Sequence, residues 1–180
     1  MSTLEPEVHV IGEICGGEGF GHSNAFCSFR VEKGEYWECC EGKETGQSQV
    51  DYAQPGSAGF TWNHPLDLHF FTKSAKGWPA LSFEVGALDS TGARTLCGYG
   101  SCYIPSSPGS HDIKCPIWRP TGTPKEEITG FFLGARPQLV DKDAIFSKAS
   151  EQRYRLFTET AGYVKLKLDV IVRGDLARKT

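Results

Sequence analysis

The sequence contains no long hydrophobic run. No uninterrupted apolar stretch exceeds three residues, as at 131–133 or 170–172. A membrane-spanning helix needs about 20 apolar residues, and a signal peptide needs an apolar segment of roughly 7–15. We therefore expect neither, and predict a soluble protein that is made and kept inside the cell.

An excess of positive charge is also missing. The chain has 19 basic and 22 acidic residues and a formal net charge of −3. Proteins that bind nucleic acid usually carry a basic stripe, so we expect no nucleic-acid partner. With 180 residues, of which 39% are hydrophobic, the chain can bury a core without disulfides. We predict a single domain over 1–180 with a core at about 5–174.

The motifs of common active sites and metal sites are absent. There is no Gly-x-Ser-x-Gly and no phosphate-binding loop, and the seven cysteines form no Cys-x-x-Cys hook for zinc. Asp89 stands almost alone in its loop, whereas calcium needs several converging carboxylates. Asp67, His69 and Ser82 have the chemistry of a Ser-His-Asp triad, but no oxyanion donor accompanies them. We predict no enzyme activity, catalytic residue, metal or cofactor.

What the sequence does contain is alternation with a period of two. In 163–173 every second residue is apolar, and Lys165, Lys167 and Arg173 lie on the opposite face. Further strands are predicted at 8–14, 25–31, 66–70, 81–85, 95–104, 113–118 and 153–158. Turn residues separate them, and Ala161-Gly162 is expected to close a C-terminal hairpin. The pattern predicts an all-β fold, an antiparallel β-sandwich.

One helix interrupts this pattern. Thr123, Pro124 and Glu126 form a capping box with proline at the first helical position. Apolar residues at 128, 131 and 132 follow at helical spacing, and Gly134 is a stop signal. We expect a short helix that caps an open end or edge of the sandwich, and leave 137–152 unassigned.

Two surfaces are candidates for binding. Trp118, beside Arg119 and Pro120, is the best candidate for an exposed interface anchor, because tryptophan and arginine often dominate interface energies. If the last two strands pair as a hairpin, a basic face could contact anionic lipid at about 1 kcal/mol per residue. An ordinary solvated face explains the same pattern. The residues of this face are Arg153, Arg155, Lys165, Lys167 and Arg173.

Segments spread over nearly the whole chain resemble the B9-domain family. The most specific are the turn at 104–109 and the Trp118-Arg119-Pro120 tripeptide. The full set comprises 7–14, 64–69, 76–83, 98–109, 115–120, 137–139 and 153–156. The resemblance implies a C2-like sandwich with no catalytic residues.

The resemblance also implies a function. Family members are expected to be non-enzymatic scaffolds of the ciliary transition zone that support ciliogenesis and the ciliary gate, in the cytoplasm near the basal body and associated with the cytoskeleton. The implied partners are two sister proteins, B9 domain-containing protein 1 and the Meckel syndrome type 1 protein, and through them transmembrane tectonic-type proteins. The alternative is a peripheral membrane module that binds anionic lipid through the basic C-terminal hairpin without calcium.

Overall fold

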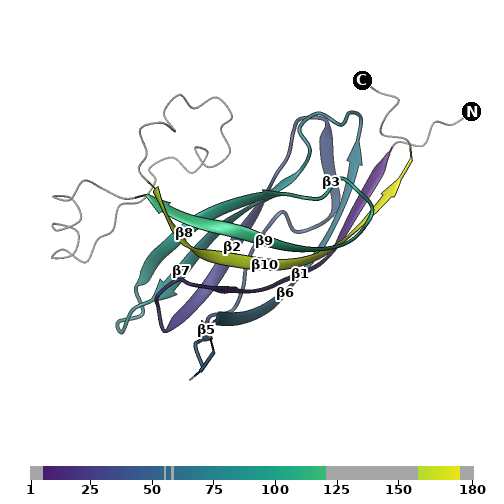
Figure 1. Ribbon diagram of the computed structural model, residues 1–180. Helices are drawn as coiled ribbons and strands as arrows, with labels where there is room; N and C mark the ends of the chain where they lie inside the picture. Colours follow the sequence, from purple (N-terminus) through teal and green to yellow (C-terminus); the bar gives the residue numbers. More distant parts are fainter. Residues whose placement is uncertain (1–5, 55, 58, 121–157, 175–180) are drawn as a thin grey trace, which may run out of the picture.

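The computed structural model describes residues 6–54, 56–57, 59–120 and 158–174. These residues form ten β-strands and no helix (Figure 1). The helix predicted near 123–134 lies outside the described residues. The strands are β1 (Glu7–Glu18), β2 (Asn24–Glu32), β3 (Trp37–Gly42), β4 (Thr45–Gln47), β5 (Asp51–Tyr52), β6 (Gly59–Thr72), β7 (Ala80–Leu88), β8 (Arg94–Tyr103), β9 (Gly109–Pro120) and β10 (Thr158–Arg173).

All strand pairs are antiparallel, which confirms the predicted all-β antiparallel class. The strand order is β3-β6-β1-β10-β9-β8-β7-β2-β4, and β5 pairs with β2. Figure 1 shows β9, β10, β1 and β6 running side by side through the middle of the molecule. The strands form one continuous sheet that folds over on itself, rather than two separate sheets. One half contains β3, β6, β1, β10 and β9, the other contains β8, β7, β2 and β4, and the two halves face each other.

The two halves meet at the junction of β8 and β9. Within the described residues, the ladder between these strands has only two pairs, Tyr99 with Trp118 and Gly100 with Ile117. A Cβ atom built on Gly100 would lie 2.4 Å from Ile117 Cδ1 and 2.8 Å from the Pro116 carbonyl oxygen. Glycine is therefore required for this close approach of β8 to β9. We call this junction the seam.

The core lies between the halves, as the alternation predicts. On β10, Val164, Leu166, Leu168 and Val170 are all buried, while the residues between them face outward. Trp62 of β6 reaches across the core, and its indole Nε1 donates a hydrogen bond to the Ala25 carbonyl oxygen of β2 at 3.1 Å. This bond directly links the two halves.

The predicted C-terminal hairpin is wrong. β10 runs without a turn from Thr158 to Arg173 and pairs with β1 and β9. Gly162 instead lies at a register shift against β9, which is a β-bulge. Its φ is +146°, and a Cβ atom there would meet the Glu18 carbonyl oxygen at 2.2 Å. Glycine is needed here for a bulge and a close backbone contact, and not for a turn.

Candidate functional site

Three polar side chains gather on the outer face of β1 and β6. Val8 and Val10 point into the core, so Glu7 and His9 share the opposite face of β1. His69 lies directly across from His9 in the register of β6. We call these three residues, Glu7, His9 and His69, the histidine cluster.

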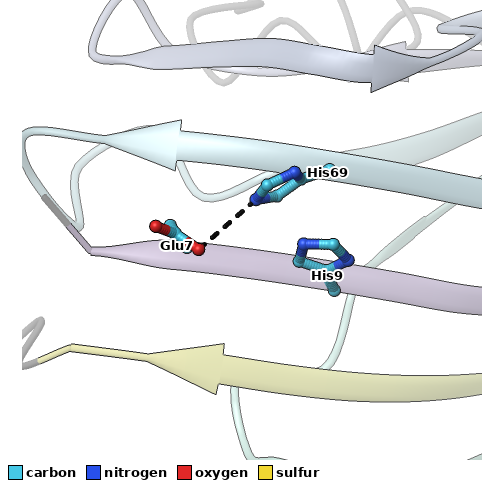
Figure 2. Close-up of side chains that lie close together, drawn as sticks. All are labelled: Glu7, His9 and His69. Carbon is cyan, nitrogen blue, oxygen red and sulfur yellow. Dashed lines mark ion pairs between the residues drawn. The ribbon is translucent and has the colours of Figure 1, made fainter.

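The side chains of the histidine cluster converge. The two imidazole rings have centroids 3.6 Å apart, and His69 Nε2 lies 3.6 Å from Glu7 Oε2 (Figure 2). One nitrogen or oxygen atom from each residue falls within 4.8 Å of the others. The guanidinium of Arg173 on β10 lies 3.8 Å from the same Glu7 oxygen. The arrangement brings two imidazoles and one carboxylate together beside one cation.

The cluster is half-buried rather than freely solvated. The side chains of His69 and Glu7 are 14% and 17% exposed. The ring of Phe71 lies 5.1 Å from that of His69, and the Cys40 thiol donates a hydrogen bond to the His69 carbonyl oxygen. His69 Nε2 is a buried atom with no hydrogen-bond partner among the described residues. A buried polar atom without a partner normally costs free energy.

The sequence contains no zinc hook that would indicate this cluster. Such hooks consist of closely spaced cysteines and histidines, whereas these residues come from positions 7, 9 and 69. Strands β1 and β6 are neighbours although four strands separate them along the chain. The one sign of the cluster in the sequence is that His9 and His69 each occupy an outward position in a segment of alternating apolar residues.

The predicted interface anchor Trp118 lies at the seam and is only partly exposed. Its ring packs 5.8 Å from that of Tyr99, which is buried on β8. Arg119 forms an ion pair with Glu159, its partner in the register of β10. A hollow of about 250 Å³ adjoins this pair; it is lined by Gly19, Phe20, Gly21, His22, Arg119, Glu159, Thr160 and Ala161. Of the three predicted interface residues, Arg119 lines this hollow, whereas Trp118 packs against Tyr99 and Leu96 and Pro120 is partly exposed.

The predicted basic face is interleaved with acidic residues. Lys165 Nζ donates to Glu18 at 2.8 Å, and this bond holds the pKa of the Glu18 carboxyl below its usual range. Lys167 lies between Glu13 of β1 and Asp112 of β9 in the register, and Arg173 lies beside Glu7. Arg153 and Arg155 lie outside the described residues. Each described basic residue of this face has an acidic neighbour.

The imagined Ser-His-Asp arrangement is not assembled. Asp67 and His69 lie on the outer face of β6, whereas Ser82 is on β7 in the other half of the sheet. The Ser82 hydroxyl donates to the Arg30 carbonyl oxygen at 3.1 Å. Asp89 Oδ1 accepts hydrogen bonds from Thr91 and Ala93, so its carboxylate stabilises the turn after β7.

Comparison with known proteins identifies the family. The sequence profile of the family described as "Ciliary basal body-associated, B9 protein" matches residues 8–171. The chain belongs to the B9 family. The B9 domain thus includes His9, His69 and the whole seam.

Named relatives cover almost the full B9 domain. The chain is 47% identical over 167 residues to B9 domain-containing protein 2 of Bos taurus, covering 93% of this chain and 94% of the relative. The relative of that name in Drosophila melanogaster is 32% identical over 170 residues, with 93% of each chain covered. B9 domain-containing protein 1 of Homo sapiens is 27% identical over 178 residues, covering 96% and 86%.

Among solved structures, a C2 domain of plant Extended Synaptotagmin 1 matches with a TM-score of 0.46 and 11% identity, covering 97% of this chain and all of that one. No helix that could serve as a membrane span occurs among the described residues.

Proposed function

We propose that this B9 protein is a non-enzymatic structural component of the ciliary transition zone, where it assembles with sister B9-domain proteins and supports ciliogenesis. The observation that carries this proposal is the family match over residues 8–171, since the family description names the ciliary basal body. The similarity to B9 domain-containing protein 1 over 96% of this chain supports assembly between related domains. The Meckel syndrome type 1 protein and, through these sisters, tectonic-type membrane proteins complete the proposed complex.

The test of assembly is co-expression with B9 domain-containing protein 1, followed by size-exclusion chromatography with light scattering. We expect a stoichiometric complex that elutes as one species and stays together on re-injection. A second co-expression that adds the Meckel syndrome type 1 protein should give a larger species. Separate elution of folded monomers in both experiments would overturn direct docking.

We propose the Trp118 corner, formed by Trp118, Arg119 and Pro120, as the docking surface. The partly exposed Trp118 ring, the Arg119–Glu159 ion pair and the hollow of about 250 Å³ that Arg119 lines support it. Tryptophan and arginine are the side chains most often found as binding hot spots, especially beside a pocket that excludes water.

Replacing Trp118 with alanine should weaken binding of the sister protein at least about 30-fold, the effect of a single hot-spot residue. Biolayer interferometry with the purified partner measures it. Because Trp118 packs on Tyr99, Trp118→Phe is the matched control, and the melting temperature of both variants must be recorded. A change below two-fold in a folded Trp118→Ala variant would remove this corner from the interface.

The lipid-binding alternative has its own test. We expect the wild-type chain to sediment weakly with anionic liposomes, because Glu18 and Glu13 neighbour Lys165 and Lys167. The double variant Glu13→Gln, Glu18→Gln should bind about ten-fold more tightly, in a salt-sensitive way. Glu38→Gln with Glu41→Gln on β3 is the control of equal charge. Strong, salt-sensitive sedimentation of the wild-type chain would instead favour the membrane module.

A further inference from the structure

We propose that the histidine cluster of Glu7, His9 and His69 is a binding site for a divalent transition-metal ion, with zinc as the ion that its donors suit best. The site lies on the outer face of β1 and β6. It goes beyond the proposed function, which needs no metal.

The donor set determines the class of ion. Two imidazole nitrogens with one carboxylate oxygen suit zinc and related transition metals, whereas calcium and magnesium prefer sites made of oxygen atoms. Three protein ligands leave one position of a tetrahedral zinc ion open for water or for a donor from another molecule. Because the cluster lies on the outer face of β1 and β6, this fourth ligand would approach from the solvent side.

The backbone holds the donors near the required spacing. In a tetrahedral site with zinc–ligand bonds of about 2.0–2.1 Å, donor atoms lie about 3.3 Å apart. His69 Nε2 and Glu7 Oε2 are already 3.6 Å apart, and the widest separation in the set is at most 4.8 Å. Binding would require the side chains to rotate until the remaining difference is closed. The register that pairs His9 with His69 keeps both Cα atoms in place.

The burial of His69 favours a ligand. Its Nε2 atom is inaccessible to water, has no hydrogen-bond partner among the described residues and faces the Glu7 carboxylate (Figure 2). A metal ion between them would satisfy this nitrogen. It would also neutralise part of the charge of the carboxylate, which is 17% exposed.

One neighbouring group opposes the ion. The Arg173 guanidinium lies 3.8 Å from Glu7 Oε2 and therefore competes with a cation for the carboxylate. Its side chain is 66% exposed, so it can turn toward solvent when an ion binds. This competition gives a variant that should improve the site: Arg173→Gln should tighten metal binding several-fold.

The test uses the full chain, with its cysteines reduced, titrated with zinc chloride in a calorimeter at neutral pH. We expect one ion per chain, and a loss of affinity of at least about 10-fold in His9→Ala and in His69→Ala. His111→Ala, on β9 and two strands from β1, is the matched control and should bind like wild type. Circular dichroism confirms that each variant is folded.

Two further measurements distinguish metal bound at the histidine cluster from metal bound by cysteine thiols. Zinc at about 100 times its dissociation constant should raise the melting temperature by about 5–10 °C in the wild type but not in His69→Ala. Cobalt should bind without the near-ultraviolet band of thiolate coordination, and Cys40→Ser should leave binding intact. Absence of binding, equal binding by the histidine variants, or a thiolate band would each overturn the proposal. These measurements use the isolated chain, so their failure would leave the proposed assembly with sister B9 proteins untouched.

Discussion

Replacing Trp62 with alanine should lower the free energy of unfolding by about 3–5 kcal/mol, the usual cost of removing a large aromatic ring from a core. Trp62 is 1% exposed, and its indole bonds to Ala25 across the interior. Since domains are stable by only about 5–15 kcal/mol, this loss brings the chain close to unfolding. Urea denaturation followed by circular dichroism measures the change.

The control for this prediction is Trp62→Phe. Phenylalanine keeps most of the apolar volume but leaves the Ala25 carbonyl oxygen without its indole donor. A buried acceptor that loses its partner costs about 1–3 kcal/mol. We therefore expect Trp62→Phe to lie between the wild type and Trp62→Ala. A Trp62→Ala variant that loses less than about 1 kcal/mol would show that the two halves do not depend on this residue.

Replacing Gly100 with valine should be the second large effect. A Cβ atom at this position would approach the backbone oxygen of Pro116 to 2.8 Å, closer than such atoms come in folded proteins. The end of the Ile117 side chain can rotate away, but the backbone of β9 must move. Overpacking of this kind costs about 1–3 kcal/mol, and the backbone contact places Gly100→Val at the upper end.

Hydrogen exchange provides the specific readout for Gly100→Val. The amide protons of the seam, Tyr99 and Ile117 among them, should lose protection more than those of the β1–β10 ladder. Thr95→Val on the same strand is the control, because it introduces the same side chain at a partly exposed position paired with Ala87. Uniform loss of protection throughout the sheet would contradict a local effect at the seam.

Much of the fold can be predicted from the sequence because most strands have one solvent-exposed face and one buried face. Polar and apolar residues therefore alternate along them. From Gly162 to Ile171 β10 alternates between buried and more exposed residues, so its buried residues follow from the period of two. β6 is longer than predicted, because the sequence predicts a strand at 66–70 and the structure has one from Gly59 to Thr72, with Pro65 inside it. In the structure, β3 pairs only with residues 68–72 of β6, so Pro65 has a strand neighbour on one side alone. Proline is tolerated at such a position because its missing N–H can face away from the ladder.

The other errors arise from contacts between distant parts of the chain. Gly162 resembles a turn residue locally, and only the backbone of Glu18 shows why glycine is needed there. β3, β4 and β5 are short or charged and depend on their neighbours for pairing. The histidine cluster requires both the adjacency of β1 and β6 and their exact register. Neither can be derived from local periodicity, since a shift of one residue would turn His69 into the core.

The seam has a mechanical consequence. Within the described residues, two ladder pairs join β8 to β9, compared with eleven between β1 and β10. Backbone pairing at the seam is therefore short, and the bond from the Trp62 indole to the Ala25 carbonyl oxygen adds a link across the core. The short seam and the core side chains together orient the two outer faces of the sheet. A partner that contacts both outer faces would therefore be sensitive to mutations of buried residues such as Trp62, which it does not contact.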